Sequence, residues 1–280
     1  MSTKVTRIGG REFRWGVRTY VMGIINVTPD SFSGDGLAGR RPEEALEEAL
    51  RFEAEGADML DVGAESTRPG HTPITVEEEL ARLLPVLDLI ASRVKLPVSV
   101  DTFKASVAER ALDAGACMVN DQWALTADAN MAGLVARRQV PVVLMHNQRG
   151  TDYRDLLPDV IASLRESAGL AMAAGAPREH IIVDPGIGFG KTAVQNLVVL
   201  RRLEELRALG YPVMVGTSRK STIGLVLGLP VNERLEGTAA TIALSIAHGA
   251  DIVRVHDVKA MARVARMSDA IVRGWSRASP

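Results

Sequence analysis

Short apolar runs alternate with longer amphipathic segments along most of this chain, and this alternation limits the folds it can adopt. Such runs are typical of buried parallel strands. They are Val21–Val27, Met59–Val62, Val98–Asp101, Met118–Asn120, Val140–Met145, Ile181–Asp184, Val213–Gly216 and Ile252–Val255. Eight strands, each followed by a helix, predict a (β/α)8 TIM barrel, and a doubly wound open sheet is the alternative.

The amphipathic segments between the strands predict helices. They are Glu43–Glu55, Val76–Arg93, Ser106–Ala114, Leu156–Ala174, Asn196–Leu209 and Glu233–His248. Gly56, Gly115, Gly210 and Gly249 each stand between a helical segment and the next strand. Helices commonly end on a left-handed glycine, so these positions predict helix ends.

The first twenty residues have a different pattern. Gly9-Gly10 separates two short alternating stretches, which predicts an N-terminal β-hairpin that closes the bottom of the barrel. No Pro-rich linker, low-complexity tract or long charge run divides the 280 residues. We therefore expect a single domain over residues 1–280, a normal length for one α/β barrel.

Composition restricts the partners and the compartment. With 33 Lys and Arg against 34 Asp and Glu, nothing indicates a nucleic-acid or anionic membrane partner. No run approaches the roughly 18 apolar residues of a membrane span, and the N-terminus lacks the apolar segment of a signal peptide. The single cysteine, Cys117, excludes an internal disulfide. We expect a cytoplasmic protein with small-molecule partners.

Polar residues follow all eight predicted strands. They are Asn26, Asp61, Asp101, Asn120-Asp121, His146, Asp184, Ser218-Arg219-Lys220 and Arg254-Val255-His256. Any one of them could simply cap the next helix, but eight together favour a functional site, because TIM barrels carry their active sites at the carboxyl ends of the strands.

These polar side chains divide by chemistry. Three offer acceptors that suit a neutral heterocycle rich in N–H groups: Asp101, Asn120 and Asp184. Three basic side chains follow the last two strands, where such barrels frequently bind phosphate: Lys220, Arg254 and His256.

Two loops rich in Gly, Ser and Pro, residues 26–36 and 65–70, place hydroxyls above strand ends, as a lid would. The alternative is that they are ordinary connections. Phe32 argues against it, since an aromatic ring in a glycine-rich loop usually covers something.

Several familiar motifs are absent. Gly190-Lys191-Thr192 resembles the end of a P-loop, but Pro185 stands where that motif requires glycine. The histidines lack the spacing of zinc ligands, and there is no Gly-x-Ser-x-Gly nucleophile turn. Cys117 stands at a strand start, which favours a core position over a nucleophile.

Seven ordered motifs resemble the dihydropteroate synthase family. Met22–Ser33 is similar to its first signature and Asp61–Gly70 to its second. The others are Pro97–Thr102, Val119–Asp121, Asp184–Thr192, Gly216–Ser221 and Arg254–Asp257. Together they extend from about Val21 to Val258. Two departures stand out: Gly34 precedes Asp35, and 147–149 differ from the family pattern, so neither position is given a role.

The resemblance implies a TIM barrel that joins 6-hydroxymethyl-7,8-dihydropterin pyrophosphate to 4-aminobenzoate, with help from Mg²⁺. It also implies inhibition by sulfonamides and a homodimer. Two alternatives are a methyltransferase that uses a methylated pterin, which should lack both loop motifs, and a non-catalytic paralogue. The latter should have lost Arg68, Asp101 or Lys220, and all three are present.

The resemblance also implies roles for individual residues. The pterin would contact Asp101, Asn120, Met145, Asp184, Lys220 and Arg254. The pyrophosphate would contact Asn26, Thr67, Arg68, Arg254 and His256, with Asn26 also on the metal. The aminobenzoate would contact Phe32, Pro69, Phe189, Lys220 and Ser221. The implied catalytic residues are Arg68, Asp101, Lys220 and Arg254.

Overall fold

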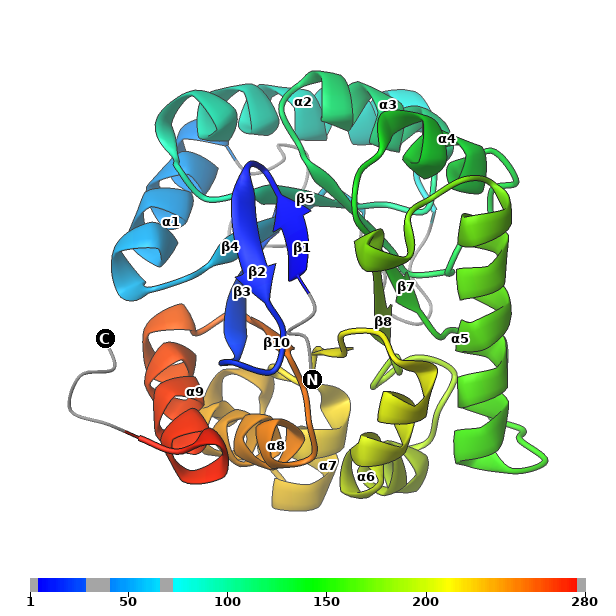
Figure 1. Ribbon diagram of the computed structural model, residues 1–280. Coiled ribbons are helices and arrows are strands. Elements are labelled where there is room, and N and C mark those ends of the chain that lie inside the picture. The colour runs from blue at the N-terminus through cyan, green and yellow to red at the C-terminus, as the bar shows by residue number, and fades with distance from the viewer. Residues whose placement is uncertain (1–4, 29–40, 66–72, 276–280) are drawn as a thin grey trace.

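Eight parallel strands form one closed sheet in the computed structural model, which describes residues 5–28, 41–65 and 73–275 (Figure 1). The strand order is β8-β7-β6-β5-β4-β3-β10-β9, and a bridge between Val183 and Val213 joins the two ends. The strands are β3 Tyr20–Asn26, β4 Met59–Gly63, β5 Val98–Asp101, β6 Met118–Asp121, β7 Val142–Met145, β8 Ile181–Asp184, β9 Met214–Val215 and β10 Ile252–Val255. The predicted (β/α)8 barrel is confirmed.

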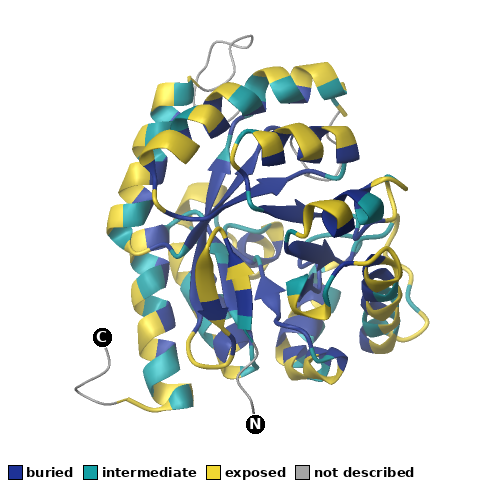
Figure 2. Cartoon of the chain, turned by 45° about the horizontal axis from the view of Figure 1, so that its top comes forward, coloured by how far each residue is buried: buried dark blue, intermediate teal, exposed yellow. Residues whose placement is uncertain are grey.

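Helices surround the barrel, with buried inner faces and exposed outer faces (Figure 2). They are α1 Pro42–Glu55, α2 Val76–Arg93, α3 Ala105–Asp113, α4 Met131–Arg138, α5 Leu156–Ala173, α6 Ala193–Arg201, α7 Ser221–Leu227, α8 Leu235–Ala247 and α9 Val258–Arg273. Short 3₁₀ segments are η2 Arg178–His180, η3 Leu203–Leu209 and η4 Val231–Glu233. Within the described residues, no helix is both long and apolar enough to cross a membrane.

The continuous helix predicted over Asn196–Leu209 is wrong. The α-helix begins earlier, at a capping box formed by Thr192 and Gln195, and ends at Arg201. Leu203, Leu206 and Leu209 then follow at a spacing of three and are all buried. A 3₁₀ helix has three residues per turn, so it places these leucines on one face against the core, which explains the change of helix type.

The hairpin and the predicted helix ends are confirmed. Gly56, Gly115, Gly210 and Gly249 all have positive φ. The hairpin pairs β1 Val5–Ile8 with β2 Arg11–Arg14 around Gly9-Gly10. Both turn glycines have positive φ, as a type I′ turn requires.

The hairpin lies across the amino ends of the strands (Figure 1). There it closes an apolar cluster of Ile8, Phe13, Trp15, Tyr20, Met22, Met59, Met118, Val143, Ile182, Met214 and Ile252. Cys117 is partly buried against this cluster, as its position at a strand start predicted. The hairpin covers the amino end, so a ligand-binding site is expected at the opposite, carboxyl end of the barrel.

Candidate active site

A cavity of about 1190 Å³ lies at the carboxyl ends of the strands. Its lining includes ten of the predicted site residues: Asn26, Asp101, Asn120, Met145, Asp184, Phe189, Lys220, Ser221, Arg254 and His256. The other four, Phe32, Thr67, Arg68 and Pro69, lie outside the described residues. Residues scattered over more than 200 positions of sequence are thus brought together, because parallel strands all end at the same edge of the barrel.

Arg254 at the end of β10 joins two buried carboxylates. Its Nε donates to Asp61 Oδ2 at 2.6 Å, and its Nη2 donates to Asp101 Oδ2 at 2.7 Å. Gln122 Nε2 donates to the other oxygen of Asp101 at 2.6 Å. Burial raises the pKa of Asp101 to about 7, although Arg254 opposes the shift. One guanidinium thus serves two acids.

Asn120 leaves an acceptor without a partner. Its Nδ2 donates to Asp61 Oδ2 at 2.9 Å, whereas its Oδ1 is buried and has no hydrogen bond within the described part of the chain. A buried polar atom left unpaired costs about 1–3 kcal/mol. Because Asn120 lines the cavity, a ligand N–H can satisfy this oxygen.

Asp184 supplies a second buried acceptor at the end of β8. Its Oδ1 accepts from the Gly186 N–H at 2.7 Å, and this is the one donor it has among the described residues. Burial raises the pKa of Asp184 to about 6, against the opposing effects of Gly186 and Lys220. Beside it, Lys220 Nζ lies 4.1 Å from the centre of the Phe189 ring. An acceptor and an aromatic wall with a cation therefore adjoin.

His256 enters the cavity as a neutral ring. Burial and the nearby Arg254 lower its pKa to about 3. Ser218 Oγ accepts from the His256 backbone N–H at 3.2 Å and lies 3.0 Å from Nδ1. The direction of the bond between Ser218 and Nδ1 depends on the ring tautomer: when the hydroxyl donates to Nδ1, the ring hydrogen lies on Nε2. A neutral His256 adds a polar ring to the cavity, whereas Lys220 and Arg254 bring the positive charge.

Comparison with known proteins identifies the family. The sequence profile described as "Pterin binding enzyme" matches residues 22–256. The chain belongs to the pterin binding enzyme family. It is 49% identical over 268 residues to the dihydropteroate synthase of Clostridium beijerinckii, which covers 95% of this chain and 99% of that protein.

Solved structures of similar proteins agree. A dihydropteroate synthase from Clostridium difficile, crystallised in the presence of pteroic acid, has a TM-score of 0.90 and 49% identity. The match covers 92% of this chain and 98% of that one. A Yersinia pestis dihydropteroate synthase in a sulfonamide drug complex has a TM-score of 0.89 and 36% identity, over 95% and 98% of the two chains.

Three polar strand-end residues of this pterin binding enzyme lie outside the cavity lining: Asp61, which accepts from Arg254 as described above, His146 and Asp121. His146 Nδ1 lies 2.9 Å from Lys191 Nζ, behind the loop that follows β8. Asp121 accepts from the backbone N–H groups of Trp123 and Leu125, both at 2.8 Å. The capping interpretation is thus correct for Asp121, which organises the turn after β6.

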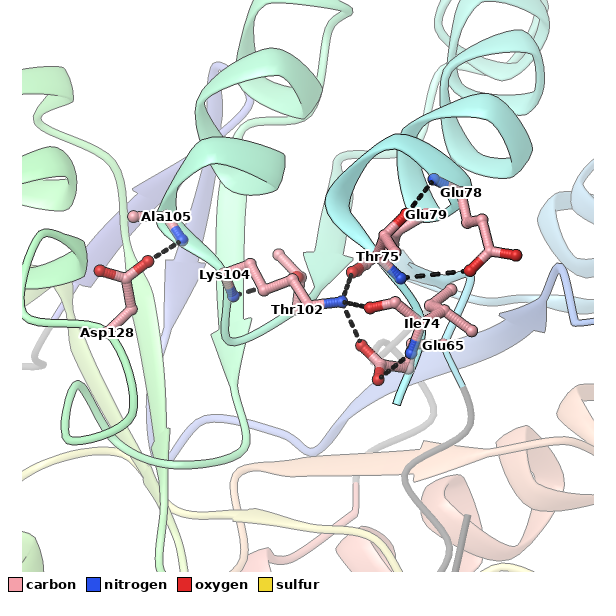
Figure 3. A network of polar contacts seen from close by, with 9 residues as sticks. All are labelled: Glu65, Ile74, Thr75, Glu78, Glu79, Thr102, Lys104, Ala105 and Asp128. Atoms are coloured by element: carbon pink, nitrogen blue, oxygen red, sulfur yellow. Dashed lines mark hydrogen bonds and ion pairs between the residues drawn. The ribbon is translucent and has the colours of Figure 1, made fainter. Parts of the chain in front are cut away.

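Sequence reasoning missed an ion-pair cluster at the base of the second loop (Figure 3). Lys104 Nζ donates to Glu65 Oε2 at 2.8 Å, to Glu79 Oε2 at 2.7 Å and to the Ile74 carbonyl at 2.7 Å. The Ile74 N–H donates in turn to Glu65 Oε1 at 3.2 Å. Glu65 and Ile74 stand on either side of residues 66–72, so one lysine joins the two ends of this segment.

Sequence reasoning gave no role to Gln122 or Lys191 either. Gln122 stands two positions after Asn120, and this closeness to a polar strand end could have indicated its role. Lys191 carried a signal that pointed elsewhere, because it resembles part of a P-loop. The structure places Gln122 on Asp101 and Lys191 against His146.

Proposed function

We propose that this cavity is the active site for dihydropteroate synthesis, the reaction that the chain catalyses. The substrates are 6-hydroxymethyl-7,8-dihydropterin pyrophosphate and 4-aminobenzoate, and the products are 7,8-dihydropteroate and pyrophosphate. The observation that carries the assignment is a single cavity lined both by the buried acceptors Asp101, Asn120 and Asp184 and by the cations Lys220 and Arg254. The relatives named above favour this transfer over the methyltransferase alternative.

The pterin ring is assigned to the buried acceptors. Its 2-amino group and N3–H present adjacent donors, which Asp184 can accept. The unpaired Asn120 Oδ1 accepts a further pterin N–H, and Met145 packs against the ring. Binding would satisfy an acceptor that the described part of the chain leaves unpaired, which would explain why such a costly group is retained in a buried position.

Bond exchange takes place at the pterin methylene carbon. The C–O bond to pyrophosphate breaks, the aminobenzoate nitrogen forms the new C–N bond, and that nitrogen then loses a proton. Asp101 is assigned to stabilise positive charge on the ring, and Arg254 and His256, which line the same cavity, are assigned to the departing anion. Thr67 and Arg68, outside the described residues, are assigned to the same anion.

The aminobenzoate is assigned to the wall formed by Phe189, Lys220 and Ser221. The aromatic ring can pack on Phe189, and the Lys220 ammonium can attract its carboxylate. Phe32 and Pro69, which lie outside the described residues, complete this proposed pocket. Sulfonamides, which resemble aminobenzoate and are bound by the Yersinia pestis relative, are assigned to the same place.

Magnesium fits this site as an ion carried mainly by substrate. Within the described residues there is no group of three or more His, Cys, Asp or Glu side chains that could hold a metal. Mg²⁺ commonly keeps several waters and binds substrate phosphates with few protein ligands. Asn26, which ends β3 and lines the cavity, would hold the ion, and the ion would help to neutralise pyrophosphate.

A homodimer is supported by apolar surface on neighbouring helices. Helix α8 packs against both α7 and α9. Exposed apolar side chains on these helices include Leu225, Val226, Leu244, Met267 and Ile271. Exposed apolar surface of this kind favours association. Sedimentation at several concentrations tests the dimer, and a monomer throughout would contradict it.

The single cysteine supports a cytoplasmic location.

One assay tests the proposed function. The protein is incubated with pterin pyrophosphate, 4-aminobenzoate and Mg²⁺, and the release of pyrophosphate is measured. We expect release to require both substrates and to stop in excess chelator, with recovery when Mg²⁺ is restored. Absence of release with both substrates would overturn the function. Full activity in chelator would overturn only the role of the metal.

A further inference from the structure

A buried lysine stands behind the proposed aminobenzoate wall. The loop over residues 185–192 connects β8 to α6, and Ile187, Gly188 and Phe189 from this loop line the cavity. Lys191 belongs to the same loop, but its side chain is only 8% exposed and turns back beneath the loop, against His146. Its role is therefore distinct from contact with a substrate.

Three acceptors surround the Lys191 ammonium. Its Nζ lies 2.9 Å from His146 Nδ1, 3.2 Å from the Gly186 carbonyl oxygen and 3.2 Å from the Phe189 carbonyl oxygen. An ammonium group has three N–H donors, so this set of acceptors matches it fully. Two of the three belong to the loop itself, on either side of Ile187-Gly188. Lys191 therefore joins the two ends of the segment that forms the wall.

The shape of the loop places these carbonyls where Lys191 can reach them. Gly186 has a φ of +69°, and a Cβ there would lie 1.9 Å from the His146 carbonyl oxygen. Gly190 has a φ of +55°, and a Cβ there would lie 2.7 Å from the Gln148 carbonyl oxygen. The loop thus lies directly on the backbone that follows β7, where water has little access. Buried carbonyls in such a place need donors from the protein.

Burying a lysine here carries a cost. Burial lowers the pKa of Lys191 to about 7, although Asp184 opposes the shift. Burial and Lys191 itself lower the pKa of His146 to about 3, so the imidazole is neutral and its Nδ1 can accept. The lysine is thus held by neutral acceptors. An expensive group without a carboxylate partner must contribute something other than an ion pair.

We propose that Lys191 is a positioning residue for 4-aminobenzoate, which holds the Phe189 carbonyl and thereby fixes the Phe189 ring against the cavity. The proposal rests on the proposed function for the identity of the ligand at Phe189. Two further bonds, from the Gly188 N–H to Asn196 Oδ1 at 2.8 Å and from Tyr153 Oη to the Gly190 carbonyl at 2.7 Å, hold the same loop from outside. Lys191 holds it from within.

A double-mutant cycle tests whether Lys191 acts through Phe189. We expect K191M to raise the KM for 4-aminobenzoate about tenfold, while the KM for pterin pyrophosphate changes by less than about twofold. F189A should raise the aminobenzoate KM by itself, and K191M added to F189A should then change it little. Additive effects, or equal rises in both KM values, would overturn the proposal. Y153F, which removes one bond to the same loop, is the matched control and should change either KM less than about threefold.

Hydrogen exchange gives a second test that needs no substrate. The Phe189 N–H donates to the Gly186 carbonyl at 3.1 Å, and K191M should speed its exchange at least about tenfold while strand β8 keeps its protection. H146L, which removes one acceptor and leaves the lysine, should give a smaller increase and covers the case in which K191M does not fold. Unchanged exchange at Phe189 in the folded variants would overturn the proposal. If K191M shows the expected faster exchange at Phe189 but the wild-type protein releases no pyrophosphate, the proposed function is overturned instead.

Discussion

The two ends of this barrel differ in what their buried polar groups serve. At the amino end, Trp15 Nε1 donates to Thr6 Oγ1 at 2.8 Å, and the Tyr20 hydroxyl accepts from the Arg14 N–H at 2.8 Å. Among the described residues, buried atoms without a partner occur at both ends: His180 Nδ1 beside the hairpin, and oxygens of Asp61 and Asn120 at the carboxyl end. Of these three residues only Asn120 lines the cavity, so the amino end serves packing, whereas the carboxyl end keeps groups available for ligands.

The carboxyl end also contains a half-buried lysine, Lys104, and a buried lysine, Lys191, with opposite surroundings. Lys104 lies between Glu65 and Glu79, which raise its pKa although burial opposes them. Lys191 lies among neutral acceptors, and burial lowers its pKa to about 7. Both lysines join the two sides of a loop, so a βα-loop can be held either by an ion pair or by an ammonium among carbonyls. Only the ion pair also leaves buried carboxylates behind when the lysine is removed.

The largest effect is expected at the amino end, and on stability alone. W15A should lower the free energy of unfolding by about 3–5 kcal/mol, because Trp15 is 7% exposed and packs against Phe13 and Tyr20. The measurement is urea denaturation, and kcat/KM of the folded fraction should stay at the wild-type value. W275A is the matched control, since Trp275 is 68% exposed and should matter little. A large loss of kcat/KM in folded W15A would remove the distinction between the two ends.

The next effect is expected at the carboxyl end, and on catalysis. R254A should lower kcat/KM about 10²–10³-fold, the usual loss when a group that stabilises developing charge is removed. Adding more aminobenzoate should recover little of it, because the defect lies with pyrophosphate. R138A is the control: Arg138 pairs with Asp113 on the surface. Wild-type kinetics in R254A would remove Arg254 from the site.

D184N should separate binding from stability at a single residue. An amide presents a donor to the pterin donors, so pterin affinity should fall by about 1–3 kcal/mol, roughly 5- to 150-fold. The measurement is calorimetric titration. Unchanged affinity would mean that Asp184 only caps the Gly186 turn.

The same variant should change how stability depends on pH. Burial raises the folded-state pKa of Asp184 to about 6, so the stability that this carboxyl contributes is full below its unfolded pKa and is lost as pH rises through about 6. D184N has no carboxyl at this position, so it does not lose this stability as the pH rises. Between pH 5 and pH 8, the Tm of D184N relative to wild type should therefore rise. If Tm depends on pH in the same way in both proteins, ionisation of Asp184 does not destabilise the folded state.

The difference between the two ends also decided what could be predicted from sequence. Strand positions and strand-end residues followed from hydrophobic pattern, because parallel strands in a closed barrel align their ends. Helices α4, α7 and α9 were not among the named segments. In α7 the exposed Leu225 and Val226 obscure the amphipathic period. The break at Arg202 was missed because three-residue and helical spacing look alike over one or two turns.

The interactions within the site could not be predicted in the same way. Arg254 on β10 meets Asp61 on β4, with strand β3 between them and 193 positions away in sequence, and which inward-facing side chains meet depends on their rotamers. Lys191 turns beneath its own loop only because Gly186 and Gly190 adopt left-handed conformations. A pattern of residue types shows which side chains gather at one end, but not which atoms bond there.

The smallest effect is expected for the proposed metal ligand at the carboxyl end. An amide oxygen among waters and phosphate oxygens should contribute about 1 kcal/mol, so N26A should raise the Mg²⁺ concentration for half-maximal rate roughly fivefold. N26D should lower that concentration, because a carboxylate attracts the cation more strongly than an amide does. The two variants should therefore move the metal requirement in opposite directions from one position. The measurement is initial rate against Mg²⁺ at saturating substrates, with circular dichroism to confirm folding. If both variants keep the wild-type requirement, Asn26 does not reach the ion, and its place at the end of β3 serves the substrate alone.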